Sequence, residues 1–213
     1  MKTNRNIRTS GKVRRLSLTA LAAAGLMAFG PSFAGMLKGQ VLGAGAPIAD
    51  SSVTLWNASA GAPKQLAQVR TDAQGRFALA VPDAGPGSSL YLVARGGKAT
   101  ANKGSSDNPA IALMTVLGSK APAQVTINEM TSVASVWTHA QFIDGGASIK
   151  GQPLQLKIAA GNVPNFVNLA SGGWGNTIQD ALNSTQSQTM ANFATLANVL
   201  AGCVSSVKPN ACP

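Results

Sequence analysis

The run Leu90-Tyr91-Leu92-Val93-Ala94 constrains the fold more than any other segment, because it is apolar at every position. Side chains of a β-strand alternate between the two faces of a sheet, so Leu90 and Leu92 share one face while Tyr91 and Val93 share the other. A strand that is apolar on both faces is usually central or covered on both sides. The run therefore predicts that another layer of structure packs over the sheet to which it belongs.

Five short runs of the chain have the composition and the turn boundaries of β-strands. They lie at residues 37–42, 52–57, 66–70, 76–81 and 89–95. In the second run Val53 and Leu55 fall on one face of the strand and Trp56 on the other. The segment 71–75 joins the third and fourth runs, with an Asp and a Gly placed as a hairpin turn requires. These runs predict an antiparallel β-domain at residues 35–98.

Four stretches of this β-domain share a pattern with a known family. They are Gly39-Gln40-Val41, Ala46-Pro47-Ile48-Ala49, Val53-Thr54-Leu55 and Thr71-Asp72-Ala73-Gln74-Gly75-Arg76-Phe77, of which the last is the most specific. They resemble the transthyretin-like sandwich of carboxypeptidase regulatory-like domains and collagen-adhesin B-type repeats. The resemblance implies an Ig-like (prealbumin-like) antiparallel β-sandwich without catalysis of its own. Members of this family serve as stalks, spacers and binding modules on exported proteins.

Residues 1–34 have the organisation of a secretory signal peptide. Six Lys and Arg and no acidic residue lie in the first fifteen positions, and an apolar stretch without charge follows at residues 16–29. That stretch is short for a bilayer span, which needs about 20 residues. Small residues precede the expected cleavage site between Ala34 and Gly35, so the mature chain is predicted to begin at Gly35. An uncleaved membrane anchor is the less favoured alternative, and the Arg14-Arg15 pair leaves twin-arginine export open beside ordinary Sec export.

The positive charge of the chain lies mainly in this leader. The full sequence has 17 Lys and Arg against 7 Asp and Glu, a net charge of +10. Without the six basic residues of the leader the balance is 11 against 7, or +4, spread along the chain. We therefore expect no nucleic-acid partner and no membrane span after the leader is removed. The expected location is the periplasm, the cell surface or the medium.

Residues 107–213 are predicted to be a helical region that a linker at residues 99–106 joins to the β-domain. A first helix is expected to begin at Pro109, with Asn108 as its cap, and to end before Gly118. Together with the β-domain, such a region gives an α+β fold class.

A second helix is expected from the capping box Thr126-Ile127-Asn128-Glu129 to Gly145, with Val125 and Met130 as a hydrophobic staple. Its single histidine, His139, is expected to be half-exposed. Trp137 is expected on its apolar side.

A last helix is expected to begin near Thr185 and to bury Phe193 among other apolar residues. Shorter helical pieces are expected at residues 154–160, 164–170 and 177–182. The helices are the available cover for the doubly apolar strand, so we expect them to dock on the sheet; an independent helical domain is the alternative.

Residues 108–114 and 125–129 resemble the region that follows such a sandwich in bacterial exported proteins of unassigned activity. In some of those proteins a β-propeller follows. The resemblance leaves open that this chain is the N-terminal fragment of a larger secreted protein, with a propeller or a hydrolase part beyond Pro213.

The two cysteines, Cys203 and Cys212, are predicted to form a disulfide. An even pair in an exported chain is most simply a disulfide, and no cluster of histidines or acids accompanies the pair as a metal site would require.

The residues that carry catalysis in common enzymes do not form a recognisable pattern. His139 is the sole histidine, and no Gly-x-Ser-x-Gly segment marks a nucleophile. The acidic residues are scattered, at Asp50, Asp72, Asp83, Asp107, Glu129, Asp144 and Asp180. We therefore expect a protein that is not an enzyme and that needs no metal or cofactor.

Two tryptophans are the remaining candidates for a ligand site. Trp56 points away from Val53 and Leu55, and Trp174 lies in a Gly-rich segment, so each could offer a flat platform to a sugar ring. The competing interpretation is that both rings are packing residues, as most large aromatic side chains are.

These observations predict an exported, non-enzymatic structural or binding module whose partner is a cell-surface protein or a polysaccharide. A carbohydrate-binding accessory module is the alternative.

Overall fold

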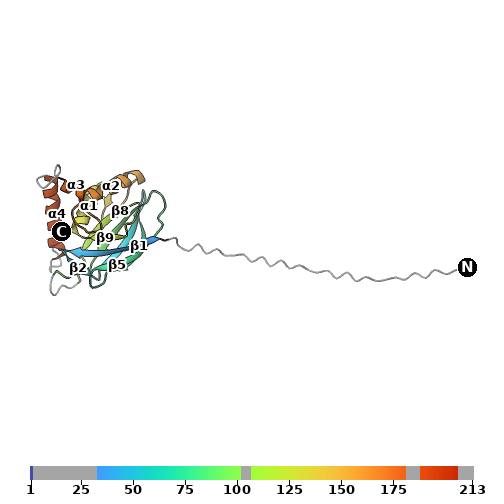
Figure 1. Ribbon diagram of the computed structural model, residues 1–213, viewed down its shortest axis with the longest axis horizontal. Helices are drawn as coiled ribbons and strands as arrows, with labels where there is room; N and C mark the ends of the chain where they lie inside the picture. The colour runs from blue at the N-terminus through green and yellow to red at the C-terminus, as the bar shows by residue number, and fades with distance from the viewer. Residues whose placement is uncertain (2–32, 102–106, 181–187, 206–213) are drawn as a thin grey trace. The chain divides into compact units, whose positions relative to one another are not determined.

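Two β-sheets and a group of helices pack on one another in this protein (Figure 1). The computed structural model describes Met1 and residues 33–101, 107–180 and 188–205. Residues 31–213 cluster into one compact unit. Most of the expected signal peptide, residues 2–32, lies outside the described residues, and so do residues 102–106 of the expected linker.

The first sheet is built around the longest strand of the chain, β1 (Phe33–Gly43). Its other strands are β2 (Ala46–Ala49), β5 (Arg76–Pro82), β7 (Lys98–Ala99) and β9 (Gln124–Ile127). β1 lies between β5, to which it is antiparallel, and β9, to which it is parallel. The end of β1 turns into β2, which pairs with β7.

The second sheet has the order β4-β3-β6-β8, and all its pairs are antiparallel. Its strands are β3 (Ser52–Ala58), β4 (Lys64–Arg70), β6 (Ser89–Arg95) and β8 (Ala112–Gly118). All five strand runs predicted from the sequence are confirmed, within a few residues at their ends.

A hydrophobic core fills the space between the two sheets. Val53, Leu55 and Leu92 of the second sheet are completely buried there, against Leu79 and other residues of the first sheet. Gly39 of β1 stands opposite Phe77 of β5 in the first sheet, and a Cβ atom on Gly39 would lie only 2.3 Å from Cζ of the Phe77 ring. Glycine at this position therefore lets the Phe77 ring lie across β1.

The opposite face of the second sheet is covered by helices. They are α1 (Glu129–His139), α2 (Pro153–Phe166), α3 (Asn176–Gln179) and α4 (Gln188–Val204), with a small hairpin of β10 (Ile143–Asp144) and β11 (Ser148–Ile149) beside them. Tyr91 and Val93 of β6 pack with Phe193 of α4 in a second hydrophobic core. The fold class is therefore α+β, as predicted. No helix within the described ranges has both the length and the apolar character needed to cross a membrane.

The doubly apolar strand is β6, and both of its faces are buried. Leu90 and Leu92 belong to the core between the sheets, whereas Tyr91 and Val93 belong to the core under the helices. The prediction that a further layer covers this sheet is confirmed.

The predicted helix from Pro109 to Gly118 is wrong, because most of this segment is strand β8. The side chain of Asn108 does act as a cap, but for a turn: its Oδ1 accepts a hydrogen bond from the N–H of Ala110 at 3.1 Å. The chain then extends along the free edge of β6, where Leu113 faces one core and Met114 the other. Pairing with β6 thus overrides the local helix signals.

The predicted capping box lies two residues too early. The N-cap of α1 is Asn128, whose side chain accepts from the N–H of Thr131, while the Thr131 hydroxyl accepts from the N–H of Asn128. Thr126 lies in β9. Val125 is buried between the sheets, whereas Met130 packs against the core under the helices, so the two do not form a staple.

The remaining helix boundaries also shift. α1 ends at His139 instead of at Gly145, because the chain turns there into the β10–β11 hairpin. The expected piece at 154–160 lies within α2, the piece at 164–170 is helical only to Phe166, and the piece at 177–182 overlaps α3. The expected start of the last helix at Thr185 falls outside the described residues, and α4 is described from Gln188.

Candidate functional site

The edge of the second sheet is closed by side chains of α1. The hydroxyl of Ser132 accepts from the backbone N–H of Met114, and the hydroxyl of Ser135 accepts from the N–H of Val116, both at 2.9 Å. These hydroxyls donate in turn to carbonyl groups of α1 one turn earlier. The edge strand β8 is therefore tied to the helix by hydrogen bonds as well as by packing.

An apolar pocket of about 460 Å³ opens between this helix, α4 and the second sheet. Its lining comes from strands β6 and β8, from α1 and its C-cap residue, from α4, and from Ile143 and Ala147 of the hairpin region. The lining consists of Val93, Ala112, Leu113, Met114, Ser132, Val133, Val136, Trp137, Ala140, Ile143, Ala147, Leu196 and Leu200. Ser132 is the one polar side chain in this lining, and its hydroxyl is occupied by the bonds to β8 and α1.

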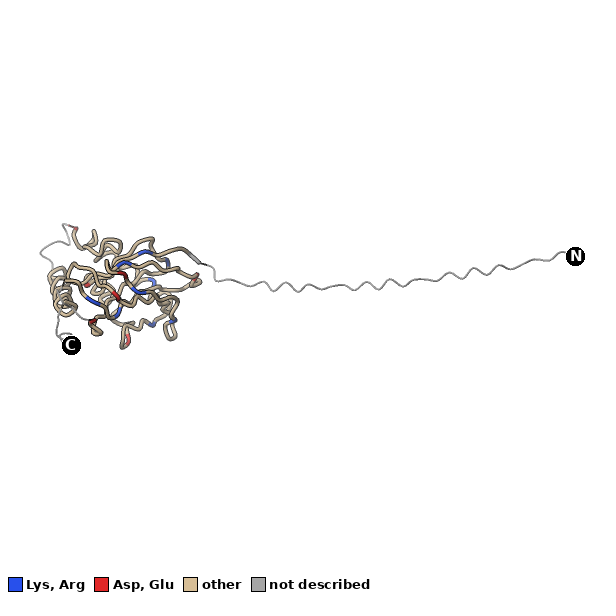
Figure 2. The backbone as a smooth tube through the Cα atoms, turned by 90° about the horizontal axis from the view of Figure 1, so that it is seen from below, with Lys and Arg blue, Asp and Glu red and all other residues tan. Residues whose placement is uncertain are grey.

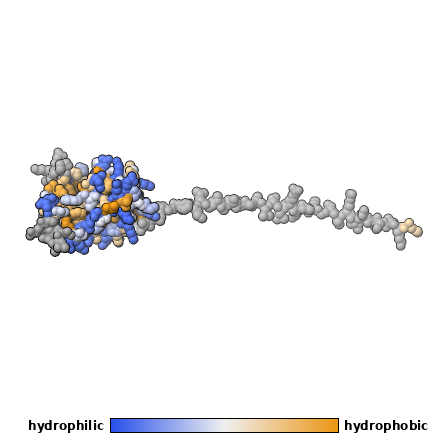
Figure 3. Space-filling model, turned by 90° about the horizontal axis from the view of Figure 1, so that it is seen from above, coloured by the Kyte–Doolittle hydropathy of each residue, from blue (hydrophilic) through white to orange (hydrophobic). Residues whose placement is uncertain are grey.

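The walls of the pocket present large apolar side chains to solvent. Val136 is 46% exposed, Trp137 is 38% exposed and Leu196 is 48% exposed. Figure 3 shows hydrophobic residues that reach the surface among hydrophilic ones. Apolar groups that stay exposed around a concave site favour binding of an apolar ligand, because the ligand removes them from water.

Trp137, which lines the pocket, also belongs to a cluster of aromatic rings. Phe193 is completely buried at its centre, with ring centroids 5.8 Å from Phe166, 6.3 Å from Trp137 and 5.5 Å from Trp174. This packing holds the ring of Trp137 between the pocket and the core.

The two tryptophans predicted as ligand platforms lie in different places. Trp56 on β3 stacks on Tyr91, with the ring centroids 6.4 Å apart and the planes 16° apart. Trp174 packs on Phe193 of the aromatic cluster. Both rings are half-buried. The structure does not bring them together into one surface, and a sugar-binding role for either stays a prediction.

His139 is completely buried at the end of α1, so the expectation that it is half-exposed is wrong. Its Nδ1 lies 3.1 Å from the carbonyl oxygen of Ser135, to which it donates, and 2.8 Å from the hydroxyl of Thr138. Within the described residues, Nε2 has no hydrogen-bond partner. Burial lowers the pKa of His139 from 6.5 to about 4, although the bond to Ser135 opposes the shift.

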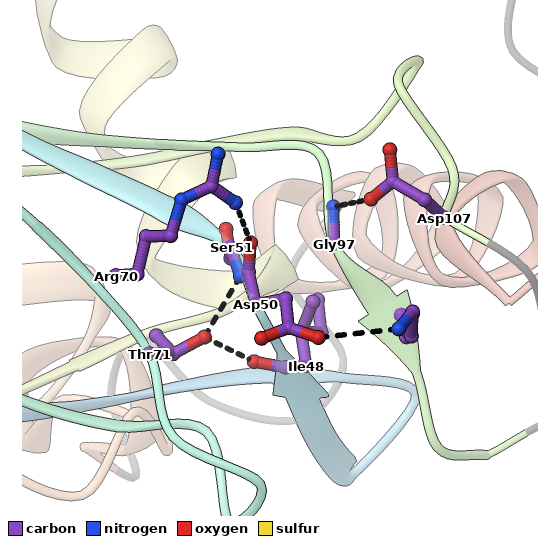
Figure 4. Close-up of polar contacts among 8 residues, drawn as sticks. Ile48, Asp50, Ser51, Arg70, Thr71, Gly97 and Asp107 are labelled. Atoms are coloured by element: carbon purple, nitrogen blue, oxygen red, sulfur yellow. Dashed lines mark hydrogen bonds and ion pairs between the residues drawn. The ribbon is translucent and has the colours of Figure 1, made fainter.

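Several of the acidic residues form ion pairs or hydrogen bonds within the fold. The carboxylate of Asp50 pairs with Lys98 at 3.3 Å, and that of Asp107 accepts from the N–H of Gly97 at 2.8 Å (Figure 4). In the same region the hydroxyl of Thr71 donates to the carbonyl of Ile48 at 2.8 Å. Within the residues that the structure describes, no three His, Cys, Asp or Glu side chains gather as a metal site would require.

Of the two acids predicted in a turn and in a capping box, Asp72 has the predicted role, whereas Glu129 does not cap its helix. Oδ1 of Asp72 accepts from the N–H groups of Gln74 and Arg76, which confirms the turn predicted at residues 71–75. Glu129 is buried, and its carboxylate accepts from the N–H of Ala44 at 2.7 Å, so it ties α1 to the turn after β1.

The predicted processing and cross-linking residues lie near the ends of the described chain. Ala34 and Gly35, the expected cleavage site, lie at the start of β1. Cys203 lies in the last turn of α4. Its expected partner Cys212 is outside the described residues, so the disulfide stays a prediction.

A second hollow, of about 620 Å³, lies over the outer face of the first sheet. Lys38, Arg70 and Arg76 line it with a single acid, Asp72, and with amide and hydroxyl side chains between them. None of the three cations forms an ion pair with a described residue. Figure 2 shows the charged residues spread along the strands and loops.

No protein-family model matches the chain, and no curated protein matches it. Among solved structures, a 9R-lipoxygenase from Cyanothece PCC8801 is similar over 43% of this chain and 15% of its own, at 17% identity and a TM-score of 0.30. A likeness at this level carries no argument about fold or function.

Proposed function

We propose that this protein is an exported, non-enzymatic binding module that takes an alkyl-chain ligand into the pocket between α1, α4 and the second sheet. The observation that carries the proposal is the lining: twelve of its thirteen side chains are apolar, and the one hydroxyl is already hydrogen-bonded. A volume of about 460 Å³ lies within the range of small-molecule sites, roughly 300–1,000 Å³. The ligand is bound because it removes exposed apolar surface from water.

We also propose that the two sheets form the transthyretin-like, prealbumin-like sandwich that the sequence resembles. Support comes from the core that the two sheets enclose and from their pairing, which is antiparallel except between β1 and β9 in the described strands. The fold accords with an exported module of the periplasm, cell surface or medium, to which the leader at residues 1–34 would direct the chain.

The pocket can be tested with an alkyl probe whose fluorescence rises when it leaves water. Ala140 lines the pocket and is itself exposed, so Ala140→Trp should fill the mouth and weaken probe binding by about tenfold or more. Ala191 is an exposed alanine of α4 outside the lining, and Ala191→Trp is the matched control. Equal binding by both variants and by the unaltered protein would remove the pocket from the proposal.

A second copy of the chain is the competing occupant of this apolar surface. Sedimentation of the protein over a range of concentrations distinguishes the two. The proposal predicts a monomer that binds the probe, whereas a dimer that Ala140→Trp dissociates and that excludes the probe would contradict it.

A second candidate function is binding of an acidic polysaccharide to the outer face of the first sheet. The observation that favours it is a set of three cations, Lys38, Arg70 and Arg76, that line a polar hollow and form no ion pair with a described acid, although Arg70 also donates to the carbonyl of Asp50. Cationic side chains attract carboxylated sugars, and nearby amide and hydroxyl groups can bond to sugar hydroxyls.

This candidate predicts that the protein binds polygalacturonate but not neutral dextran, and that added salt weakens the binding. Arg76→Gln should lower the affinity, whereas Lys150→Gln should not, because Lys150 lies elsewhere and is paired with Asp144 at 3.0 Å. Binding that is equal in both variants or insensitive to salt would exclude the hollow as the site.

A further inference from the structure

Arg95 is not part of the pocket lining, but it lies next to residues that are. Arg95 is the last residue of β6, two positions after Val93, which lines the pocket, so both side chains lie on the helix-covered face of the sheet. Directly across the strand pair, Arg95 stands opposite Ala112, another lining residue. Arg95 therefore lies beside two residues of the pocket lining, one on its own strand and one on the neighbouring strand.

The guanidinium of Arg95 donates through Nη2 to the carbonyl of Gly146. Gly146 precedes Ala147, which is one of the residues that line the pocket. This bond holds the side chain against the β10–β11 hairpin, and the guanidinium makes no other hydrogen bond with a described residue. An arginine has five N–H donors, so one bond leaves most of them for a ligand.

No acidic side chain neutralises Arg95 within the described parts of the chain. The ion pairs there are Lys98 with Asp50 and Lys150 with Asp144. Asp144 is the acid of the same hairpin, and its carboxylate is held by Lys150 at 3.0 Å. The apolar pocket suits an alkyl chain, and an arginine without an acidic partner beside it suits an anionic group. One molecule that has both parts is an alkyl chain with an anionic head.

We propose that the ligand is an alkyl-chain carboxylic acid, with its chain in the pocket and its carboxylate on Arg95. This inference rests on the proposed function and adds the headgroup to it. The planar guanidinium can bind a carboxylate through two parallel hydrogen bonds, which a neutral alcohol cannot form. The pocket should therefore distinguish the acid from the alcohol of the same chain length.

The experiment compares dodecanoate with 1-dodecanol by titration calorimetry at a pH near 8, where the acid is ionised. The unaltered protein should bind dodecanoate about tenfold more tightly than dodecanol. Arg95→Gln should weaken dodecanoate by about that factor and abolish the preference, while Arg95→Lys should keep part of it. Dodecyl phosphate in parallel shows whether the head must be a carboxylate or only an anion.

The control is Lys157→Gln, which removes one positive charge from an exposed position of α2 outside the pocket. It should bind both compounds as the unaltered protein does. Thermal unfolding of each variant shows whether the fold is retained.

The outcomes separate this inference from the function on which it rests. If neither compound binds the unaltered protein, the proposed function fails. If both bind equally and Arg95→Gln changes nothing, the role of Arg95 is overturned, and loss of that binding in Ala140→Trp would still support the pocket as the site. A stronger preference for dodecyl phosphate would also contradict the carboxylate assignment.

Discussion

The hydroxyl of Ser135 on α1 accepts a hydrogen bond from the backbone N–H of Val116 on β8, with 2.9 Å between the two atoms. Ser132, one turn earlier, does the same for Met114. The outward N–H groups of an edge strand usually need water or another strand as a partner. Here two serines of the helix take that place, so α1 and the second sheet are joined by polar as well as apolar contacts.

The first prediction concerns this junction. Ser135 is completely buried, so Ser135→Ala leaves the N–H of Val116 without a partner and should lower the free energy of unfolding by about 1–3 kcal/mol. Thr195→Ala is the matched control, since its hydroxyl also donates to a carbonyl one turn earlier but is exposed on α4. The control should change stability by less than about 0.5 kcal/mol in urea unfolding. Equal effects of the two substitutions would show that the bond to β8 contributes nothing.

The second prediction compares the loss of stability on removal of two rings of the aromatic cluster. Phe193 is completely buried, so Phe193→Ala should destabilise the protein by about 3–5 kcal/mol. Trp137 is 38% exposed, and Trp137→Ala should cost clearly less, about 1–3 kcal/mol. Urea unfolding of both variants measures the order. A larger loss for Trp137→Ala would mean that its ring is more deeply packed than the structure shows.

The third prediction is a pH dependence of stability that comes from His139. Its pKa falls from 6.5 in the unfolded chain to about 4 in the folded protein, because the ring is buried. The unfolded state therefore binds more protons between these pH values, and stability falls as the pH is lowered from about 6.5 to 4. The loss should be a few kcal/mol in urea unfolding at a series of pH values.

His139→Gln tests the origin of this slope. His139 is the sole histidine of the chain, so the variant should have a much flatter profile between pH 6.5 and 4. Asp144 provides an internal contrast: the bond to Lys150 lowers the pKa of its carboxyl, so its effect lies below this window. The same slope in the variant and in the unaltered protein would rule out His139 as the cause.

The fourth prediction is that Cys203 and Cys212 are bridged in the exported protein. Alkylation without reductant should label neither cysteine, and the loss of the bridge should lower stability by about 2–4 kcal/mol. Complete labelling of both cysteines in protein taken from the native compartment would contradict the prediction.

The fifth prediction is that the mature chain begins at Gly35. Cleavage after Ala34 would leave the pairing of β1 with β5 from Met36, opposite Ala80, to Gln40, opposite Arg76. The sheet should therefore persist without the leader. Mass spectrometry of the exported protein gives the N-terminus directly, and an intact Met1 on the exported protein would refute the prediction.

The fold could be predicted from the sequence where a segment's own pattern decides its structure. β6 is apolar on both faces, and that pattern alone indicated a covering layer. β8 could not be predicted in this way, because Asn108 and Pro109 are typical of a helix start, while the strand depends on the free edge of β6 some twenty residues earlier in the chain. The same holds for Thr126, whose pairing in β9 requires β1.

The candidate site was even less accessible to sequence analysis. The pocket joins residues from Val93 to Leu200, which only the packing of α1 and α4 on the second sheet brings together. The side of α1 that faces the sheet carries the buried residues Ser132 and Ser135, whereas the apolar Val136 is exposed. The distribution of apolar residues along this helix therefore does not show which side faces the sheet. The spacing of these serines is the one local signal that could have indicated a helix against a strand edge.

A two-dimensional NMR titration of the isotope-labelled protein with dodecanoate shows residue by residue where the alkyl chain binds. Amide shifts should change for Met114, Val136 and Leu196 around the pocket and for Arg95 beside it, while those of Lys38 and Arg76 on the outer face of the first sheet stay fixed. Shifts confined to the outer face, or no saturable shifts at all, would contradict the claim that this pocket binds an alkyl chain.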